Sequence, residues 1–405
     1  MKKIIIQVIA LFIGTLSYGQ SLEGLIQEAL KNNPEIQKVE TAYKGVLEKK
    51  NEVNTLPNSQ IGFGYFASEP ETRTGAQRFK LSLKQMIPWF GSITARENYI
   101  GSLADAKYEE IAIVKRKLIA SISQGYYNLI TIREKQQILT KNVALLRTYE
   151  TMALTSVETG KASAVDVLKL QIRQNDLKQL VQVLEQQFLS EQSNINKLLN
   201  RKREVKIEVG DSLVMPKSLD LIDMEKVSIH PELLKYDKLY KSIEQSELLN
   251  QKEQKPMIGF GLDYVAVSER PGMNFSDNGK DIVMPMVSLS IPIFNKKYSS
   301  KTKQNKLKQE ELLFGKQTRQ NKLIVMLDQA INERVSAKIS FDTNSNNLEK
   351  ANSAEQILLK SYESGSINFN DVLDIQELQL KFQMNQVKNI RSFYMQSTII
   401  NYLSN

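Results

Sequence analysis

Apolar residues recur every three to four positions in some stretches of this chain and every second position in others. Stretches of the two kinds follow one another in the same order in both halves of the chain. Residues 22–55 carry apolar side chains three and four positions apart, which predicts an amphipathic helix with a break at Asn33-Pro34. Residues 61–67 and 79–87 alternate apolar with small or polar side chains, which predicts two strands joined by a polar loop. Residues 92–200 return to the helical period and predict a pair of long helices.

The second half shows the same order of elements. A predicted helix over residues 224–254 precedes predicted strands over residues 258–267 and 283–293, and two long helices hinged at Gly365 follow. The expected fold class is mainly α with a small β part. Its long antiparallel coiled-coil helices are accompanied by four strands in each chain.

Short motifs recur between the halves and indicate a duplication. Glu158-x-Gly160, five residues and Asp166-Val-Leu recur as Glu363-x-Gly365, five residues and Asp371-Val-Leu, with the two glycines 205 positions apart. In each copy a glycine can end one helix and a Ser or Asn can cap the next, which predicts a tight helix-turn-helix tip. Three other pairs keep the same order: Asn-Pro-Glu at 33–35 with His-Pro-Glu at 230–232, Ile-Gly-Phe-Gly at 61–64 and 258–261, and Ile-Pro-x-Phe at 87–90 and 291–294.

The domain organisation expected from these repeats is one interwoven body over residues 20–405, with repeat one at 20–205 and repeat two at 224–405. Residues 1–19 have the two lysines, apolar run and small residues of a secretory signal. The alternative, a membrane anchor, is disfavoured because the apolar run is too short to span a bilayer. Removal of two lysines lowers the formal net charge from +9 to +7, since 52 basic residues then face 45 acidic ones.

Composition excludes several chemistries. The chain has no cysteine and a single histidine, His230, whose place before a proline indicates a turn role. We therefore expect no enzyme, no cofactor and no metal site. Met284 and Met286 leave a soft-metal role as a minor alternative. Interspersed acidic and basic residues in an exported chain disfavour a nucleic-acid partner.

Four strands with one apolar and one polar face suit a sheet in contact with lipid, but four strands cannot close a barrel. Open sheet edges are not viable in lipid, so several chains must pool strands, and three chains give twelve. Aromatic residues near the strand ends fit either a girdle at the membrane surface or ordinary packing; they are Tyr65, Phe66, Trp89 and Phe90.

Two charged features have both a plain and a functional interpretation. The lysine run over residues 296–308 is either a solvated helix face, which is favoured, or a contact with anionic headgroups at the periplasmic membrane surface. Asp371 and Asp374 are one helical turn apart, so they form either a solvated face or, in a ring of three chains, six carboxylates that attract cations.

Together these residues resemble the TolC family of outer-membrane efflux proteins. The resemblance covers essentially the whole mature chain and is carried by the duplicated layout, the Asn-Pro-Glu, the Ile-Pro-Trp-Phe-Gly strand exit and the Gly-x5-Asp-Val-Leu tips. It implies a homotrimer in the cell outer membrane, with a shared twelve-stranded transmembrane β-barrel and an α-helical tunnel that extends into the periplasm. It also implies contacts with outer-membrane lipid, a periplasmic adaptor and an inner-membrane efflux pump.

The resemblance assigns roles to individual residues near the tips. Asp371 and Asp374 match the acidic constriction of the periplasmic gate, and Asp166 and Tyr362 match residues that tie the coils shut. Gly160 and Gly365 match the turns that contact the adaptor. Ile367 is a departure, because the arginine of the family's best-known latch is missing there.

The function expected from the resemblance is a passive exit duct of a tripartite efflux system, which carries small molecules or cations and hydrolyses nothing. The strand exit looks most like branches that serve heavy-metal or cation pumps. Two alternatives remain at this point: a periplasmic coiled-coil adaptor or scaffold, and the outlet of a type I protein secretion system. The predicted lipid-facing sheet favours the duct over an adaptor.

Overall fold

The chain forms two compact units, and each unit contains segments of both repeats. A computed structural model describes residues 21–160, 163–210, 212–218, 224–364, 366–367 and 369–404. Unit 1 comprises the chain up to Pro34, Lys115–Met224 and the chain from Ile324 onward. Unit 2 comprises Glu35–Val114 and Glu225–Leu323. The expected signal segment, residues 1–19, lies outside the described residues.

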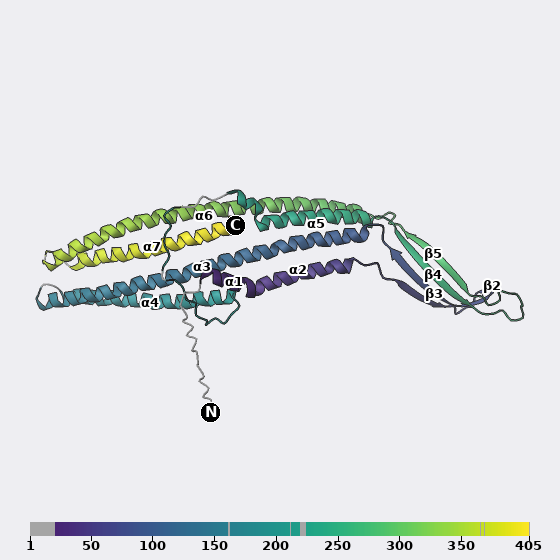
Figure 1. The fold of residues 1–405 in the computed structure, drawn as a ribbon, viewed down its shortest axis with the longest axis horizontal. Coiled ribbons are helices and arrows are strands. Elements are labelled where there is room, and N and C mark those ends of the chain that lie inside the picture. The colour runs from purple at the N-terminus through teal and green to yellow at the C-terminus, as the bar shows by residue number, and fades with distance from the viewer. Residues whose placement is uncertain are drawn as a thin grey trace, which may run out of the picture. The chain divides into compact units, whose positions relative to one another are not determined.

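The predicted helices are confirmed (Figure 1). They are α1 Leu22–Asn32, α2 Pro34–Val53, α3 Ser92–Glu158, α4 Ala164–Leu198, the 3-10 helix η1 Met224–Ile229, α5 Pro231–Glu253, α6 Lys297–Glu363 and α7 Phe369–Ser404. Among the described residues, no helix carries an apolar stretch long enough to cross a membrane.

The predicted breaks before Pro34 and Pro231 are caps. Asn33 is the C-cap of α1, and its side-chain amide donates to the carbonyl of Leu198 at 2.8 Å. His230 is the fully buried N-cap of α5, where Nδ1 accepts a hydrogen bond from the backbone N–H of Glu232 at 3.3 Å. The predicted turn role of His230 is therefore confirmed.

Four strands of unit 2 form an antiparallel sheet in the order β1-β3-β4-β5 (Figure 1). Their bounds are β1 Gln60–Tyr65, β3 Gly75–Ile87, β4 Met257–Val267 and β5 Ile282–Ser290. The predicted polar loop also holds a two-residue strand, β2 Glu71–Thr72, which pairs with β3. The fourth strand ends at Ser290, three residues earlier than predicted, because the chain turns at Ile291, whose carbonyl accepts from the N–H of Ile293 at 2.9 Å.

The sheet has one apolar and one largely polar face, as the alternation predicts. Register places Phe63, Leu81, Tyr264 and Val283 side by side across the strands on the apolar face. Large apolar side chains on this face are exposed in the single chain, among them Ile61, Phe63, Leu83, Phe260, Val283, Val287 and Leu289. The unit therefore needs an apolar environment outside the sheet.

The opposite face carries charge and glycine. Lys80 of β3 makes an ion pair with Asp263 of β4, whose side chain is fully buried. A side chain at Gly259 would collide with Ser288 and Met86. These contacts explain why the Ile-Gly-Phe-Gly motif of the second repeat keeps its glycines: neighbouring side chains lie over the backbone of β4.

The apolar stripe of α4, whose residues have a largely coiled-coil spacing, divides between two faces of the helix. Phe188, Ile195 and Leu199 of that stripe are buried, as is Leu177. The remaining members are exposed or half-buried, and Val165, Leu168, Ile172 and Leu180 are 54%, 56%, 62% and 48% exposed. In the single chain this spacing therefore does not correspond to one continuous buried face. The physical reason is that α4 has apolar side chains on two faces, and only one face packs within the chain.

Candidate functional site

The candidate site consists of the two helix-to-helix turns of unit 1, where α3 passes to α4 and α6 passes to α7. At the first turn Gly160 has a φ of 69° and donates its N–H to the carbonyl of Val157 at 3.0 Å. A Cβ at Gly160 would have no heavy atom within 4 Å, so backbone conformation, not space, calls for glycine here. Ser163 caps α4 by accepting from the N–H of Val165 at 3.2 Å, as predicted.

The second turn keeps the hydrogen bonds of a helix end. The N–H of Ser364 donates to the carbonyl of Lys360 at 3.1 Å, and the N–H of Ser366 reaches back to the carbonyl of Ser361 at 2.9 Å. A bond over this span belongs to the Schellman type of helix termination. Gly365 itself lies outside the described residues, so its role stays a prediction.

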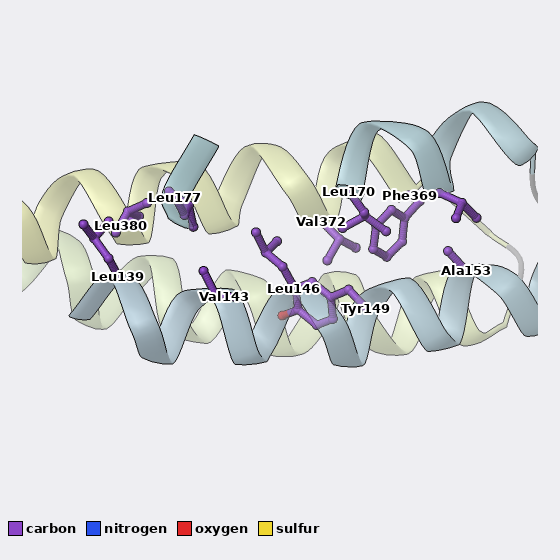
Figure 2. Packing of buried hydrophobic residues seen from close by; sticks show 11 residues of the cluster. Leu139, Val143, Leu146, Tyr149, Ala153, Leu170, Leu177, Phe369, Val372 and Leu380 are labelled. Atoms are coloured by element: carbon purple, nitrogen blue, oxygen red, sulfur yellow. The ribbon is translucent and has the colours of Figure 1, made fainter. Parts of the chain in front are cut away.

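Phe369, the first residue of α7, anchors the two turns to each other. Its side chain is 1% exposed, and its ring lies 5.9 Å from the ring of Tyr149 and 4.9 Å from that of Tyr362, both in edge-on geometry. Figure 2 shows this ring beside Leu170 and Val372. The buried cluster draws on α3, α4 and α7: Leu139, Val143, Leu146, Tyr149, Ala153, Val167, Leu170, Leu177, Phe369, Val372 and Leu380.

A polar pair below each turn ties the two helices of a hairpin together. The amide of Gln174 in α4 donates to Glu150 in α3 at 2.7 Å, and the amide of Gln379 in α7 donates to Glu355 in α6 at 2.8 Å. Both glutamines are buried, at 4% and 5% exposure. The second pair lies 205 positions after the first, the same offset that relates Gly160 to Gly365.

The sequence analysis predicted the tip motifs and the aspartates but not these Glu–Gln pairs. The common offset of 205 residues is the signal that identifies them. Glu355 also accepts a hydrogen bond from the hydroxyl of Tyr149, which joins the two hairpins. Burial and this bond to Glu355 raise the pKa of Tyr149 well above its ordinary value, so the phenol stays protonated.

The structure places the two predicted gate aspartates on an exposed face of α7. Asp371 and Asp374 are one turn apart, and Asp374 lines a groove of about 380 Å³ between α4 and α7. Two cations of α4 line the same groove. Lys169 donates to Asn370 at 3.0 Å, and Arg173 pairs with Glu377 at 3.4 Å.

Asp166 and Tyr362, the predicted ties, are not joined to each other within one chain. Asp166 lies in the first turn of α4 and is 8% exposed. The Tyr362 hydroxyl is buried and has no hydrogen-bond partner among the described residues. Tyr362 lines a cavity of about 630 Å³ whose other walls are hydroxyl-rich: Thr148, Thr151, Met152, Thr155, Ser156, Thr159, Glu363 and Ile367.

Ile367, at the position where the resemblance expects the latch arginine, is one wall of this cavity and supplies no charge there. Across the described part of the chain, no group of three or more His, Asp or Glu side chains is arranged to hold a metal ion. The chemical groups that the two turns offer are therefore the hydroxyls around the Tyr362 cavity and the exposed carboxylates of Asp371 and Asp374.

Comparisons with known proteins agree with this geometry. Residues 25–201 match the family model described as outer membrane efflux protein. Among curated proteins, none matches the sequence. Among solved structures, CusC has a TM-score of 0.78 at 13% identity over 96% of this chain and 93% of its own.

Two other solved structures are similar over nearly the whole chain. VceC from Vibrio cholerae has a TM-score of 0.75 at 14% identity, with 95% of this chain and 96% of its own covered. The MtrE outer membrane channel of Neisseria gonorrhoeae, solved in an open state, has a TM-score of 0.70 at 14% identity, with 93% and 88% covered.

The fold and the family model together define a helical channel protein with a small antiparallel sheet. Residues 25–201 match the family of outer membrane efflux proteins, and nearly the whole chain has the fold of outer membrane channels. Members of this family are channels, which confirms the expectation that the chain is not an enzyme. The expected location in the outer membrane, with an extension into the periplasm, is likewise confirmed.

The polar pair of the first hairpin predicts a pH dependence. Hydrogen bonds from Gln171 and Gln174 lower the pKa of Glu150 below its ordinary value of 4.5. A carboxyl whose pKa is lowered on folding contributes stability above the unfolded pKa and loses it as pH falls through the folded pKa. We expect the wild type to melt at a higher temperature than Glu150→Gln at pH 7, and this difference to shrink below pH 4.5. Circular dichroism melts of both proteins in detergent measure it. A constant difference across this range would contradict the assignment.

Proposed function

We propose that this chain assembles as a homotrimer that forms a passive exit duct, joined at its tips by a periplasmic adaptor and through it by an inner-membrane pump. The observation that carries this proposal is the sheet of unit 2, which combines an exposed apolar face with two unpaired edges. The duct hydrolyses nothing, so the partner pump supplies the energy. Its cargo is small molecules or cations.

The edges of the sheet limit the possible assemblies. β1 and β5 each pair with one neighbour only, so each has a row of backbone groups without a strand partner. In lipid an unsatisfied backbone group costs several kcal/mol, which excludes open edges. Joining β1 of one copy to β5 of the next satisfies both rows. Three copies give a closed sheet of twelve strands.

The uncovered face of α4 supports the same assembly. Val165, Leu168 and Ile172 are three and four positions apart, so they form one helical stripe, and each is more than half exposed. A second copy packed along this stripe would cover it. Burying such side chains contributes roughly 1.5–3 kcal/mol each, which favours association of the helical parts as well as the sheets.

The surroundings of the aspartates support a gate. Both cations in the neighbouring groove are engaged elsewhere, Lys169 with Asn370 and Arg173 with Glu377. Asp371 and Asp374 make no hydrogen bond or ion pair through their side chains with the described residues. Their carboxylates are thus available to face a shared opening, where six like charges would attract cations.

The tips support docking of a helical partner. α3 and α6 contain 67 residues each, and a helix of this length rises about 100 Å along its own axis. Long helices that end in tight turns present the turns to a partner across the periplasm. The unpartnered Tyr362 hydroxyl and the threonine-lined cavity beside it offer hydrogen bonds to a neighbouring copy.

The carboxylate ring is tested by the double change Asp371→Asn with Asp374→Asn. Asparagine keeps the size and hydrogen bonding of aspartate, and the change removes six charges from a trimer. We expect the channel to assemble normally in planar bilayers but to lose most of its cation selectivity and its block by multivalent cations.

The matched control removes two acidic charges elsewhere, with Asp328→Asn and Glu349→Gln on exposed positions of α6. It should keep both properties. Unchanged selectivity and block in the aspartate variant would place Asp371 and Asp374 on an outer, solvated face.

Docking at the tips is tested at Gly160. Valine at a φ of 69° strains the backbone by about 1–2 kcal/mol, whereas asparagine tolerates this conformation. We expect Gly160→Val to remain trimeric but to lose efflux in cells and adaptor binding, and Gly160→Asn to keep both. Crosslinking to the adaptor and gel filtration of the trimer distinguish these outcomes, and loss of the trimer in Gly160→Val would show that the turn is structural.

A further inference from the structure

The start of α6 carries positive charge that the chain itself does not balance. Residues 296–309 contain six lysines and no acidic residue. Four of them, Lys296, Lys297, Lys301 and Lys303, lie in the first two turns or directly before them, and we call these the α6 lysine segment. All four are exposed, and their ammonium groups make no hydrogen bond or ion pair with the described residues. The ammonium group of Lys297 lies 5.6 Å from the ring centroid of Tyr298.

The duplication supplies an internal comparison. The corresponding start of α3, residues 92–105, has one arginine and two acidic residues. Its Arg96 pairs with Glu253 at 3.1 Å. A helix start in this position of the fold therefore does not require a run of lysines.

The placement of the α6 lysine segment is also unfavourable for the helix. The N-terminus of a helix carries a partial positive charge and favours acidic side chains, and the first turn of α6 has none. Lysines at this end repel the helix dipole and each other. Binding of an anion from outside the protein would offset this repulsion between the lysines and the start of α6.

Packing against α5 leaves these lysines exposed. The opposite side of α6 is held to α5, where the amide of Asn250 donates to the carbonyl of Tyr298 at 3.0 Å. Glu247 accepts from the hydroxyl of Thr302 and the amide of Asn305, both at 2.8 Å. Tyr298, Thr302 and Asn305 face α5, so Lys296 and Lys303 lie on the opposite side of the helix, and Lys297 and Lys301 lie exposed at its flank.

The segment follows directly on the apolar edge of the sheet. After Ser290 ends β5, the side chains of Ile291, Ile293 and Phe294 are 50%, 65% and 101% exposed. The end of β3 lies at the same edge, since Ile87 pairs with Ile258 and Met257 pairs with Ser290. Trp89 and Phe90 follow β3 there, so aromatic and apolar side chains mark this edge at both strands.

We propose that the α6 lysine segment binds the phosphates of anionic phospholipids in the periplasmic leaflet of the outer membrane. The proposal rests on the proposed placement of the sheet in that membrane. The order along the chain matches a membrane surface: apolar sheet, exposed aromatic and aliphatic rim, then unpaired cations. Lys297 to Lys303 spans about 9 Å of helix, comparable to a headgroup layer. Interspersed acidic residues are missing here, as in juxtamembrane basic segments that bind acidic lipid.

Trp89 provides the measurement, because it is the only tryptophan of the chain and lies at the same edge of the sheet. The full chain is reconstituted into phosphatidylcholine vesicles that contain brominated phosphatidylglycerol or brominated phosphatidylcholine, and quenching of Trp89 fluorescence reports which lipid lies beside it. At low salt we expect stronger quenching by phosphatidylglycerol. Changing the four lysines to glutamine should lower this preference roughly tenfold or more.

Two matched variants separate charge from other effects. Changing the same four lysines to arginine keeps the charge and should keep the preference. Changing four exposed, unpaired lysines of unit 1 to glutamine removes the same charge elsewhere and should also keep it; these are Lys141, Lys202, Lys350 and Lys381.

Two outcomes overturn the proposal, and they differ in what else they overturn. If brominated phosphatidylcholine quenches Trp89 but phosphatidylglycerol has no advantage, or if the glutamine variant keeps the advantage, the lipid site is wrong and the membrane placement stands. If neither brominated lipid quenches Trp89, the sheet does not lie in the bilayer and the proposed duct fails as well.

Discussion

Backbone hydrogen bonding at the two edges of a small sheet is the constraint on which this molecule depends. Among the described residues, β1 and β5 end the sheet, and one edge of each has N–H and C=O groups without a strand partner. Their side chains point alternately to an exposed apolar face and to a face that carries Lys80 and Asp263. A sheet of this kind is unstable in water because of its apolar face and in lipid because of its edges. The proposed association of identical copies would resolve both problems at once, and it would also cover the exposed stripe of α4.

In unit 1, the α3–α4 and α6–α7 hairpins must keep one alignment although the apolar core between them is small. A narrow apolar seam around Phe369 fixes the depth of packing. Polar ties fix the pairing: Gln174 to Glu150 within one hairpin, Gln379 to Glu355 within the other, and Tyr149 to Glu355 between them. Buried amide-to-carboxylate bonds are costly to leave unmade, so they favour one alignment of the helices over slipped ones. The tips can then present their aspartates at a defined position on α7.

Much of this architecture could be predicted from the sequence, because the spacing of apolar residues and the residues that start or end helices and strands are strong local signals. The breaks at Asn33 and His230, the strand pair around Gly62 and the capped tip at Ser163 all follow from short-range rules. The side-chain partners could not be predicted. Which face of α4 is buried depends on the helices that pack against it, so the spacing alone does not show that Val165 and Leu168 stay exposed in the single chain. The Glu–Gln ties were detectable only through the offset of 205 residues between repeats.

The central claim is that β1 of one copy pairs with β5 of the next in a closed ring of three. The chain has no cysteine, so introduced pairs report without background. Gly64→Cys on β1 is combined in turn with Met284→Cys, Met286→Cys or Ser288→Cys on β5, all on the face opposite the apolar one. Within one chain these strands lie about 14 Å apart, too far for a disulfide. Oxidation of the membrane-embedded protein should give covalent dimers and trimers for at least one pair, and nothing larger. Monomers alone for all three pairs, or a ladder that continues beyond three chains, would contradict the shared closed sheet.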